Sequence, residues 1–402
     1  MNRTMMKNFL LLGILLFTGV IAFAQSGDDI TSEELAGSNN PIEYSAAFLT
    51  ISPDSRAGAM GDVGAATSPD YSSMHWNPAK YAFIESDMGI SVSLTPWLRN
   101  LVNDINLGYL NFYKRIDNKQ TVAATLLYFD LGDIQFTNEF GEYDGQHSPY
   151  EMSIDVAYAR SFSDRFSGGI AFRYVRSDIT GGTTVGALET KPANAFAADI
   201  SMYYVNDNLK LSDKNLTWSF GINISNIGNK ISYTEVEKDF LPTNLKIGTA
   251  FKYELDSYNT LTLAFDINKF LVPTPPRYSA TNTDSIIAGY DPEVSVPEGM
   301  IQSFYDAPGG FEEEIKEFKY SIGAEYWYAN QFAVRAGYFH EDQNKGNRKY
   351  FTVGAGLRLN IFTIDFSYLL PVKQNNPLAN TMRFTLGLDF DALKARKKTK
   401  EI

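Results

Sequence analysis

Three histidines are the residues best suited to hydrolytic chemistry, because an imidazole is the usual general base for a serine or cysteine nucleophile. The sequence holds His75, His147 and His340 and no cysteine. None of the three lies in a recognisable nucleophile motif, and the Gly-x-Ser-x-Gly pattern of serine hydrolases is missing. The chain also lacks the Cys/His clusters of zinc sites. The sequence therefore predicts no catalytic, cofactor-binding or metal-ligating residues.

Three evenly spaced glycines, Gly58, Gly61 and Gly64, are the next candidates, because glycine-rich loops can cradle phosphate groups. A phosphate-binding loop of that kind continues into Gly-Lys-Ser or Gly-Lys-Thr, and this one does not. The stretch is followed by a short motif, Trp76, Asn77, Pro78 and Ala79. We favour a compact, tightly turning plug folded inside a barrel, within an N-terminal periplasmic or plug segment at residues 25–86.

The first 24 residues have the composition of a secretory signal peptide. Arg3 and Lys7 precede an apolar run over residues 9–23, and Ala22–Ala24 supplies a small-residue cleavage site. A membrane anchor is the alternative, but about 15 apolar residues fall short of the roughly 20 that a spanning helix needs. We therefore expect cleavage of residues 1–24 and, with no cysteine to acylate, no lipid anchor.

The charge balance is acidic, with 35 basic and 47 acidic residues and a formal net charge of −12. Binding of nucleic acid needs clustered positive charge, so nucleic acid is not an expected partner. Aromatic residues make up 14% of the chain, with 24 tyrosines and 28 phenylalanines. That content fits either a large soluble β-protein or a barrel whose strands are apolar on one face only.

Side-chain alternation separates these two classes. Between Leu216 and Ser225 the apolar residues fall on one face of an extended chain and the polar residues on the other. The segments predicted in this way are fourteen in number and span residues 87–94, 105–115, 120–130, 150–163, 165–178, 194–206, 215–225, 242–254, 258–268, 318–328, 330–340, 349–358, 361–370 and 380–390. A tilted strand needs about 9 to 11 residues to cross a bilayer, which matches these lengths.

The connections between these segments alternate in length, short after even-numbered segments and longer after most odd-numbered ones. Outer-membrane barrels have short periplasmic turns, longer external loops and, with an even strand number, both chain ends in the periplasm. A β-sandwich or propeller does not require this pattern of links. We predict an all-β fold, a 14-stranded antiparallel transmembrane β-barrel at residues 87–390 in the outer membrane, with a basic periplasmic tail at 391–402.

The polar face of the predicted strands carries charges of both signs. These residues are Asp155, Arg173, Asp199, Lys246, Lys252, Asp266, Glu325, Arg335, Arg358, Asp365 and Asp389. Opposite charges inside a barrel can pair and so remain away from bulk water. We favour a structural network in the lumen over a permeation pathway.

The connection at residues 269–317 is far longer than usual, and loops of that size commonly carry function. Its last part, residues 311–318, is predicted to form a short acidic helix. Apolar residues on an external loop either pack against the barrel rim or dock on another protein. The predicted partner-binding residues are Met300, Ile301, Phe304, Tyr305 and Phe311.

Several blocks of consecutive residues carry a resemblance to a known family. They are residues 40–42, 53–58, 60–67, 76–81, 95–98 and 102–106, followed by 269–276 and 299–313 in the long loop. Together they resemble the PorV family, outer-membrane shuttle proteins of the Bacteroidota type IX secretion system. The resemblance implies a FadL-like fourteen-stranded barrel, in which residues 77–79 are similar to an element of the plug.

The resemblance also implies a function and partners. Members of the family take the folded C-terminal signal domain of a secreted cargo from the translocon barrel. They deliver it to a cell-surface attachment complex, where a sortase-like protease removes the signal. The expected partners are therefore the translocon, cargo signal domains and the sortase-like complex, besides outer-membrane lipid and lipopolysaccharide.

Two rival functions remain open at this point. The first is a FadL-like transporter of hydrophobic small molecules, which predicts an apolar internal pocket with a lateral gap or plug kink leading to it. The second is a lipopolysaccharide deacylase, which predicts a serine within hydrogen-bond reach of a histidine near the outer face of the membrane. Among the histidines, His340 alone is even roughly placed for that role.

Overall fold

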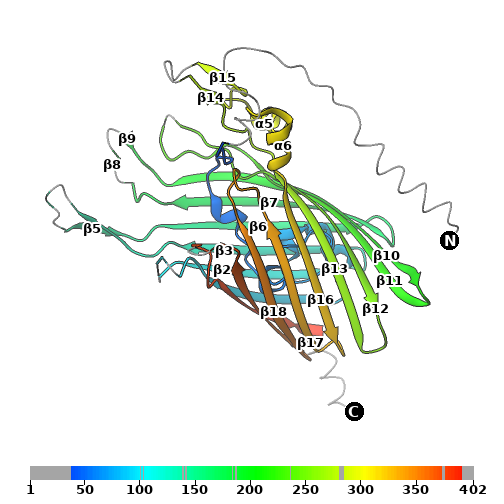
Figure 1. Cartoon of the computed structure of the whole chain (residues 1–402). Coiled ribbons are helices and arrows are strands. Elements are labelled where there is room, and N and C mark those ends of the chain that lie inside the picture. Colours follow the sequence, from blue (N-terminus) through cyan, green and yellow to red (C-terminus); the bar gives the residue numbers. More distant parts are fainter. Residues whose placement is uncertain are drawn as a thin grey trace.

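The computed structural model describes residues 38–99, 101–102, 104–137, 140, 143–182, 184–185, 188–235, 237–279, 285–373 and 376–391. Within these residues, fourteen antiparallel strands close into one barrel, and the last strand pairs with the first (Figure 1). The predicted fold class is therefore confirmed. The predicted signal peptide at 1–24 and residues 392–402 of the predicted tail lie outside the described residues.

Each barrel strand overlaps one of the fourteen predicted segments. The strands are β1 (Met88–Pro96), β2 (Asn106–Arg115), β3 (Gln120–Asp130), β6 (Tyr150–Ser161), β7 (Phe166–Asp178), β10 (Ala193–Leu211), β11 (Lys214–Gly228), β12 (Asn244–Glu254), β13 (Asn259–Phe270), β16 (Lys319–Tyr328), β17 (Phe332–His340), β18 (Lys349–Leu359), β19 (Phe362–Pro371) and β20 (Met382–Asp389). Short turns gather at one end of the barrel and long loops at the other. We call these the periplasmic end and the external end, because outer-membrane barrels distribute their connections in this way.

The hairpin of β10 and β11 is longer than predicted. The sequence predicted a link over residues 207–214, whereas the two strands continue and turn at Ser212 and Asp213. Both turn residues have left-handed backbones, with φ of 50° and 65°, a geometry that matches the twist of a hairpin. A hairpin that projects beyond the membrane has water on both faces, so its tip need not alternate polar and apolar residues. Because the residues at the tip do not alternate between polar and apolar, the sequence did not predict them as parts of the two strands.

Along the barrel strands, polar side chains are buried in the lumen and alternate with apolar side chains that are exposed on the outer face, as expected for a membrane barrel. On β6, Ser153 and Asp155 are buried in the lumen, whereas Ile154 and Val156 are exposed on the outer face. On β20, Thr385 is buried and its neighbours Phe384 and Leu386 are exposed. Lipid chains are the natural cover for an apolar outer face of this kind.

Two arginines in the lumen are each held between two carboxylates on nearby strands of the barrel. The pairs and their N–O distances are Arg173–Asp155 (2.5 Å), Arg173–Asp199 (3.2 Å), Arg335–Glu325 (2.7 Å) and Arg335–Asp365 (2.6 Å). All of these side chains are buried. A buried charge is costly unless it is paired and hydrogen-bonded, and these geometries meet both conditions. The predicted structural network is confirmed for these residues.

The chain before the barrel runs inside it. Residues 46–86, which we call the inner segment, form η1 (Ala47–Thr50), α3 (Ser55–Gly58), α4 (Ser73–Trp76) and η2 (Pro78–Phe83), drawn in blue within the barrel in Figure 1. None of the helices in the described part of the chain is long and apolar enough to cross a membrane. Irregular backbone inside a barrel needs partners for its N–H and C=O groups, and the wall supplies them.

Side chains of the barrel wall hold the backbone of the inner segment. Asp266 on β13 accepts from the N–H groups of Gly64 and Ala65, at 2.7 and 2.9 Å. Four strands away along the wall, the Ser167 hydroxyl on β7 donates to the carbonyl of Ala79 at 2.7 Å. The polar face of the barrel therefore acts as a set of sites for backbone groups.

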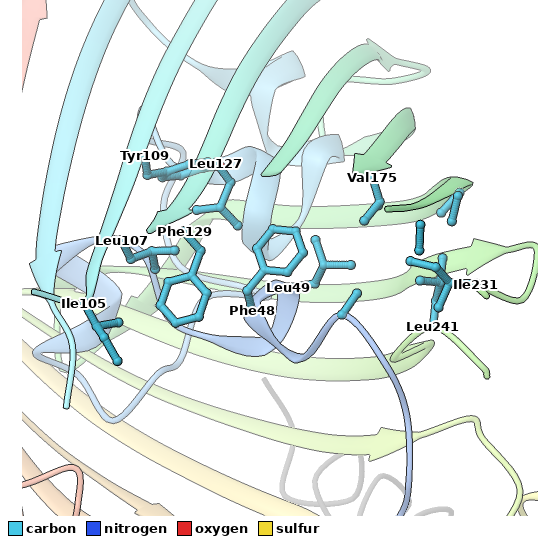
Figure 2. Packing of buried hydrophobic residues seen from close by; sticks show 14 residues of the cluster. Phe48, Leu49, Ile105, Leu107, Tyr109, Leu127, Phe129, Val175, Ile231 and Leu241 are labelled. Carbon is cyan, nitrogen blue, oxygen red and sulfur yellow. The ribbon is translucent and has the colours of Figure 1, made fainter. Parts of the chain in front are cut away.

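Apolar contacts hold the outer part of the inner segment. Phe48 and Leu49 are buried, and Figure 2 shows them between side chains of β2 and β3 on one side and those of β7 and the 229–243 connection on the other. Burying a side chain of this size stabilises a fold by about 1.5 to 3 kcal/mol. These two residues fix the inner segment near the external end.

The described chain starts at the external end. The backbone N–H of Asn40 donates to the carbonyl of Asn344, in the connection between β17 and β18, at 2.9 Å. Its side-chain amide donates to Glu313 at 2.9 Å and to the carbonyl of Pro275 at 3.1 Å, both in the long loop. The sequence predicted a periplasmic or plug segment at residues 25–86, and it gave no indication that the chain would pass the external end before entering the barrel. An even strand number fixes only where β1 begins and β20 ends, and it leaves the path of the preceding chain open.

Candidate partner-binding surface

The long loop at residues 269–317 carries secondary structure of its own. It contains β14 (Arg277–Tyr278), β15 (Ile286–Ala288), α5 (Val296–Gln302) and α6 (Gly310–Lys316), which lie beyond the external end of the barrel in Figure 1. The acidic helix predicted at 311–318 is confirmed as α6, displaced by one or two residues at its ends. The loop is therefore a folded unit and not an irregular connection.

A buried charge network fastens α6 to the barrel. Lys345, in the β17–β18 connection, places its Nζ 2.6 Å from Glu313 and 3.0 Å from Glu317. Lys269, near the end of β13, contacts Glu317 and lies 3.2 Å from Glu314. All five side chains are buried. The acidic face of α6 therefore points into the protein, the reverse of an ordinary surface helix.

The long loop also carries large apolar side chains that are exposed. We call this set of side chains the loop patch, and it consists of Ile301, Phe304, Tyr305, Phe311 and Ile315. Their exposed fractions run from 47% for Ile315 to 71% for Phe311. Monomeric proteins rarely leave grouped large apolar side chains in water without a partner.

Four of the five residues predicted for partner binding belong to the loop patch, and Met300 does not because it is half-buried. Ile315 was missed, although its position four residues after Phe311 on a predicted helix places both on one face. Lys269 links the two helices, since its Nζ lies 5.6 Å from the centre of the Phe304 ring and 3.2 Å from Glu314. Packing against the barrel rim does not account for the four exposed residues.

Asp306, between α5 and α6, gives the loop a pH dependence. Burial, with Glu314 and Glu317 adding to it, raises the pKa of the Asp306 carboxyl to about 7, although the Thr274 N–H donates to it at 3.0 Å. In an unfolded loop the same carboxyl has its ordinary pKa near 4. The folded loop therefore binds the proton more tightly, and the stability that this proton contributes is lost as pH rises from about 4 through about 7.

We expect local opening of residues 296–317 to be easier at pH 8 than at pH 5.5, by about 1 to 2 kcal/mol. Hydrogen exchange followed by mass spectrometry, corrected for intrinsic exchange rates, measures this difference. An Asp306→Asn variant, which keeps the size of the side chain and removes its charge, should show a smaller difference. Equal pH dependence in the variant and the parent protein would rule out Asp306 as the source.

The predicted plug motif, Trp76–Ala79, lies deep in the lumen. Trp76 donates its indole N–H to Asp54 at 2.6 Å. The Asn77 amide donates to the carbonyl of Ala65 at 2.8 Å and to that of Met202, on β10, at 2.9 Å. The motif thus ties the inner segment to itself and to the barrel wall.

The histidines do not form a hydrolytic site in the described residues. His340 Nδ1 lies 3.3 Å from the hydroxyl of Tyr338, and His147 Nε2 lies 3.6 Å from Asp178. His75 is in the inner segment and packs edge-on against Trp76. The part of the chain that the structure describes also holds no group of three or more His, Asp or Glu arranged for a metal ion. Lack of enzymatic activity remains a prediction.

Comparison with solved structures returns outer-membrane transporters. The chain is 12% identical to the Pseudomonas putida toluene transporter TodX, with a TM-score of 0.45 over 87% of this chain and 98% of that chain. It is 11% identical to the Ralstonia pickettii toluene transporter TbuX, with a TM-score of 0.45 over 84% of this chain and 97% of that chain. It is 12% identical to a Pseudomonas aeruginosa FadL homologue, with a TM-score of 0.43 over 87% of this chain and 100% of that chain. No match was found among curated proteins.

Comparison with protein-family models returns a match to a secretion-system family. The family model described as type IX secretion system protein PorV matches residues 35–277, which is more than half of the chain. The matched region includes the inner segment and the strands from β1 to β13. The chain therefore belongs to the PorV family and is an outer-membrane protein of the type IX secretion system.

Proposed function

We propose that this protein carries the folded C-terminal signal domain of secreted cargo from the translocon barrel to the sortase-like attachment complex. Membership of the PorV family supports a role in type IX secretion. The observation that carries the finer proposal is the loop patch, because it places exposed apolar side chains at the external end of an anchored barrel.

The composition of the loop patch suits a protein interface. Aromatic side chains dominate the binding energy of most interfaces, and the patch contains Phe304, Tyr305 and Phe311. A patch of five side chains is small, so binding through it can be reversible, as a carrier requires. Tyr305 is held by an edge-on contact with the Tyr290 ring at 5.6 Å between centres.

The support beneath the loop patch is rigid. Lys345 and Lys269 are each buried between two glutamates of α6 and its end, so the helix has little freedom to reorient. A partner that binds a preformed surface does not have to order it, and the loss of conformational entropy on binding is smaller. The barrel and the buried charges therefore present the patch, and the patch makes the contact.

The contents of the lumen favour the carrier over a transporter of hydrophobic small molecules. The inner segment runs through the lumen and is hydrogen-bonded directly to wall residues such as Asp266 and Ser167. Charged pairs centred on Arg173 and Arg335 line the same space. An apolar solute would meet buried ions along this path, which is unfavourable.

Site-specific photocrosslinking in living cells tests the proposal. A photoreactive phenylalanine at Phe304 or Phe311 should yield adducts with proteins that bear a type IX signal domain or with the translocon. Two matched controls are Tyr258, which is 63% exposed in a periplasmic turn, and Phe172, which is 65% exposed on the outer face of β7. Adducts of the same proteins at Tyr258, or none at the loop positions, would contradict the proposed contact.

A further inference from the structure

A cavity of about 120 Å³ lies in the lumen, bounded below by the inner segment and laterally by strands of the barrel. The charged side chains that line it are Arg173, Lys246, Lys319, Arg348 and Arg383, against a single carboxylate, Asp62. The chain as a whole has a net charge of −12, so this concentration of positive charge runs against the composition. The cavity is close to the external end, because Lys246, Lys319 and Arg383 all lie near the external ends of their strands.

Two of these cations stand on one row of the barrel wall. Lys246 on β12 is opposite Asn268 on β13, and Asn268 is opposite Lys319 on β16. Neighbouring strands are about 4.8 Å apart, so the two lysine backbones are roughly 10 Å apart with an amide between them. All three side chains are at least nine-tenths buried. The row therefore directs two ammonium groups and an amide toward the same space.

Neither lysine has a carboxylate within the 4.0 Å of an ion pair among the described residues. The Nζ of Lys246 lies 4.2 Å from the centre of the Trp76 ring, and that of Lys319 lies 3.1 Å from the centre of the Phe270 ring. No hydrogen bond or ion pair to either ammonium occurs among the residues that the structure describes. An aromatic face stabilises a cation only modestly, by roughly 0.5 to 2 kcal/mol, so most of the cost of burying these charges is not offset.

Arg383 is also almost fully buried, and its guanidinium group is only partly hydrogen-bonded. Its Nε donates to the carbonyl of Ser52 at 3.0 Å, whereas its Nη1 has no partner within the described residues. The other two arginines of the lining differ, since Arg173 is paired with Asp155 and Asp199 and Arg348 is paired with Glu341. Asp62, the one carboxylate of the lining, accepts a hydrogen bond from Tyr350 at 2.5 Å.

We propose that this cavity binds a compact, multiply charged oxyanion of the phosphate or sulfate class, with Lys246, Lys319 and Arg383 as its principal ligands. Such an anion supplies the acceptor oxygens and the negative charge that these donors lack. A cavity of about 120 Å³ has room for a four-oxygen anion together with water molecules.

Titration of the purified full-length mature barrel with inorganic phosphate tests the site directly. We expect a saturable heat of binding and broadening of the phosphate ³¹P resonance, at constant ionic strength set with sodium chloride. The resonance is measured on the unmodified protein, so this part of the test does not depend on any variant folding. The proposal would be overturned if phosphate produced no heat of binding and no broadening beyond that seen with chloride alone.

Charge-removing variants assign the ligands. Lys246→Gln and Lys319→Gln should each weaken phosphate binding about tenfold or more, because each removes a charge-assisted hydrogen bond. Lys252→Gln is the matched control, since Lys252 is on the same strand as Lys246 but is exposed and outside the cavity. Unchanged affinity in both ligand variants, or an equal loss in the control, would contradict the assignment.

The same site chemistry fits a free anion or the phosphate of a lipid headgroup, and competition separates the two. Phosphatidic acid added in the same detergent displaces inorganic phosphate only when the cavity admits a headgroup. Displacement assigns the site to a lipid phosphate, and phosphate binding without displacement assigns it to a free anion. Either result supports an oxyanion site in the lumen.

Discussion

Replacing all five residues of the loop patch with serine is expected to reduce the release of mature cargo to the cell surface at least thirtyfold, with the barrel still folded. Truncation of a buried aromatic anchor at an interface typically costs 1 to 2 kcal/mol or more, and the patch has three such residues. The side chains are exposed in the free protein, so their loss has little effect on folding. Quantitative immunoblotting of surface cargo that has lost its signal domain measures the result.

A matched control removes apolar surface from the other end of the barrel. Ile116 and Tyr258 are 58% and 63% exposed in periplasmic turns, and replacing both with serine should leave cargo release unchanged. Heat-modifiable migration on gels verifies that each barrel is folded. Normal release by the loop variant, or equal loss in the control, would be incompatible with cargo or translocon contact through the loop patch.

Replacing Gly221 with valine is expected to displace the inner segment and open the lumen. A Cβ at Gly221 of β11 collides with the carbonyl oxygen of Ala65 and comes within 2.7 Å of the Asn77 side chain. The barrel strand is held on both sides by full ladders, whereas the inner segment is held to the wall by individual hydrogen bonds, so the inner segment moves. In planar bilayers we expect the frequency of open-channel events to rise more than tenfold.

Gly108 provides the control for this substitution. It lies on β2, where an added Cβ has only the carbonyl oxygen of Tyr128 nearby, at 3.9 Å. Gly108→Val should leave conductance at the level of the parent protein. A closed Gly221→Val barrel that is fully folded would show that the contact between Gly221 and the inner segment does not hold the lumen closed.

The barrel could be predicted from the sequence because a period of two is a local signal that repeats along each strand. The tip of the β10–β11 hairpin was not predicted because the residues around Ser212 and Asp213 are exposed on both faces of the hairpin, so neither face has to be apolar. The path of the inner segment escaped for a different reason. Its helices are about one turn long, and contacts such as Asp266 with the Gly64 N–H join residues 202 positions apart, which leaves no local pattern.

The binding surfaces divide in the same way. Four residues of the loop patch were predicted because large apolar residues on an external loop need a partner. Ile315 could have been predicted by the same reasoning from its spacing from Phe311. The exposure of Met300 was overestimated, because the sequence of a seven-residue helix does not reveal which of its faces is buried. The cavity cations depend on pairing register. Lys246 and Lys319 are 73 positions apart and become neighbours only through β13.

Affinity purification of the tagged protein from outer membranes, with mass spectrometry of what is retained, tests the carrier role most directly. We expect recovery of the translocon or of proteins that bear type IX C-terminal signal domains, and loss of both when the loop patch is replaced with serine. Recovery of the barrel with a small hydrophobic ligand and without any protein of the secretion system would contradict the carrier role and favour a transporter.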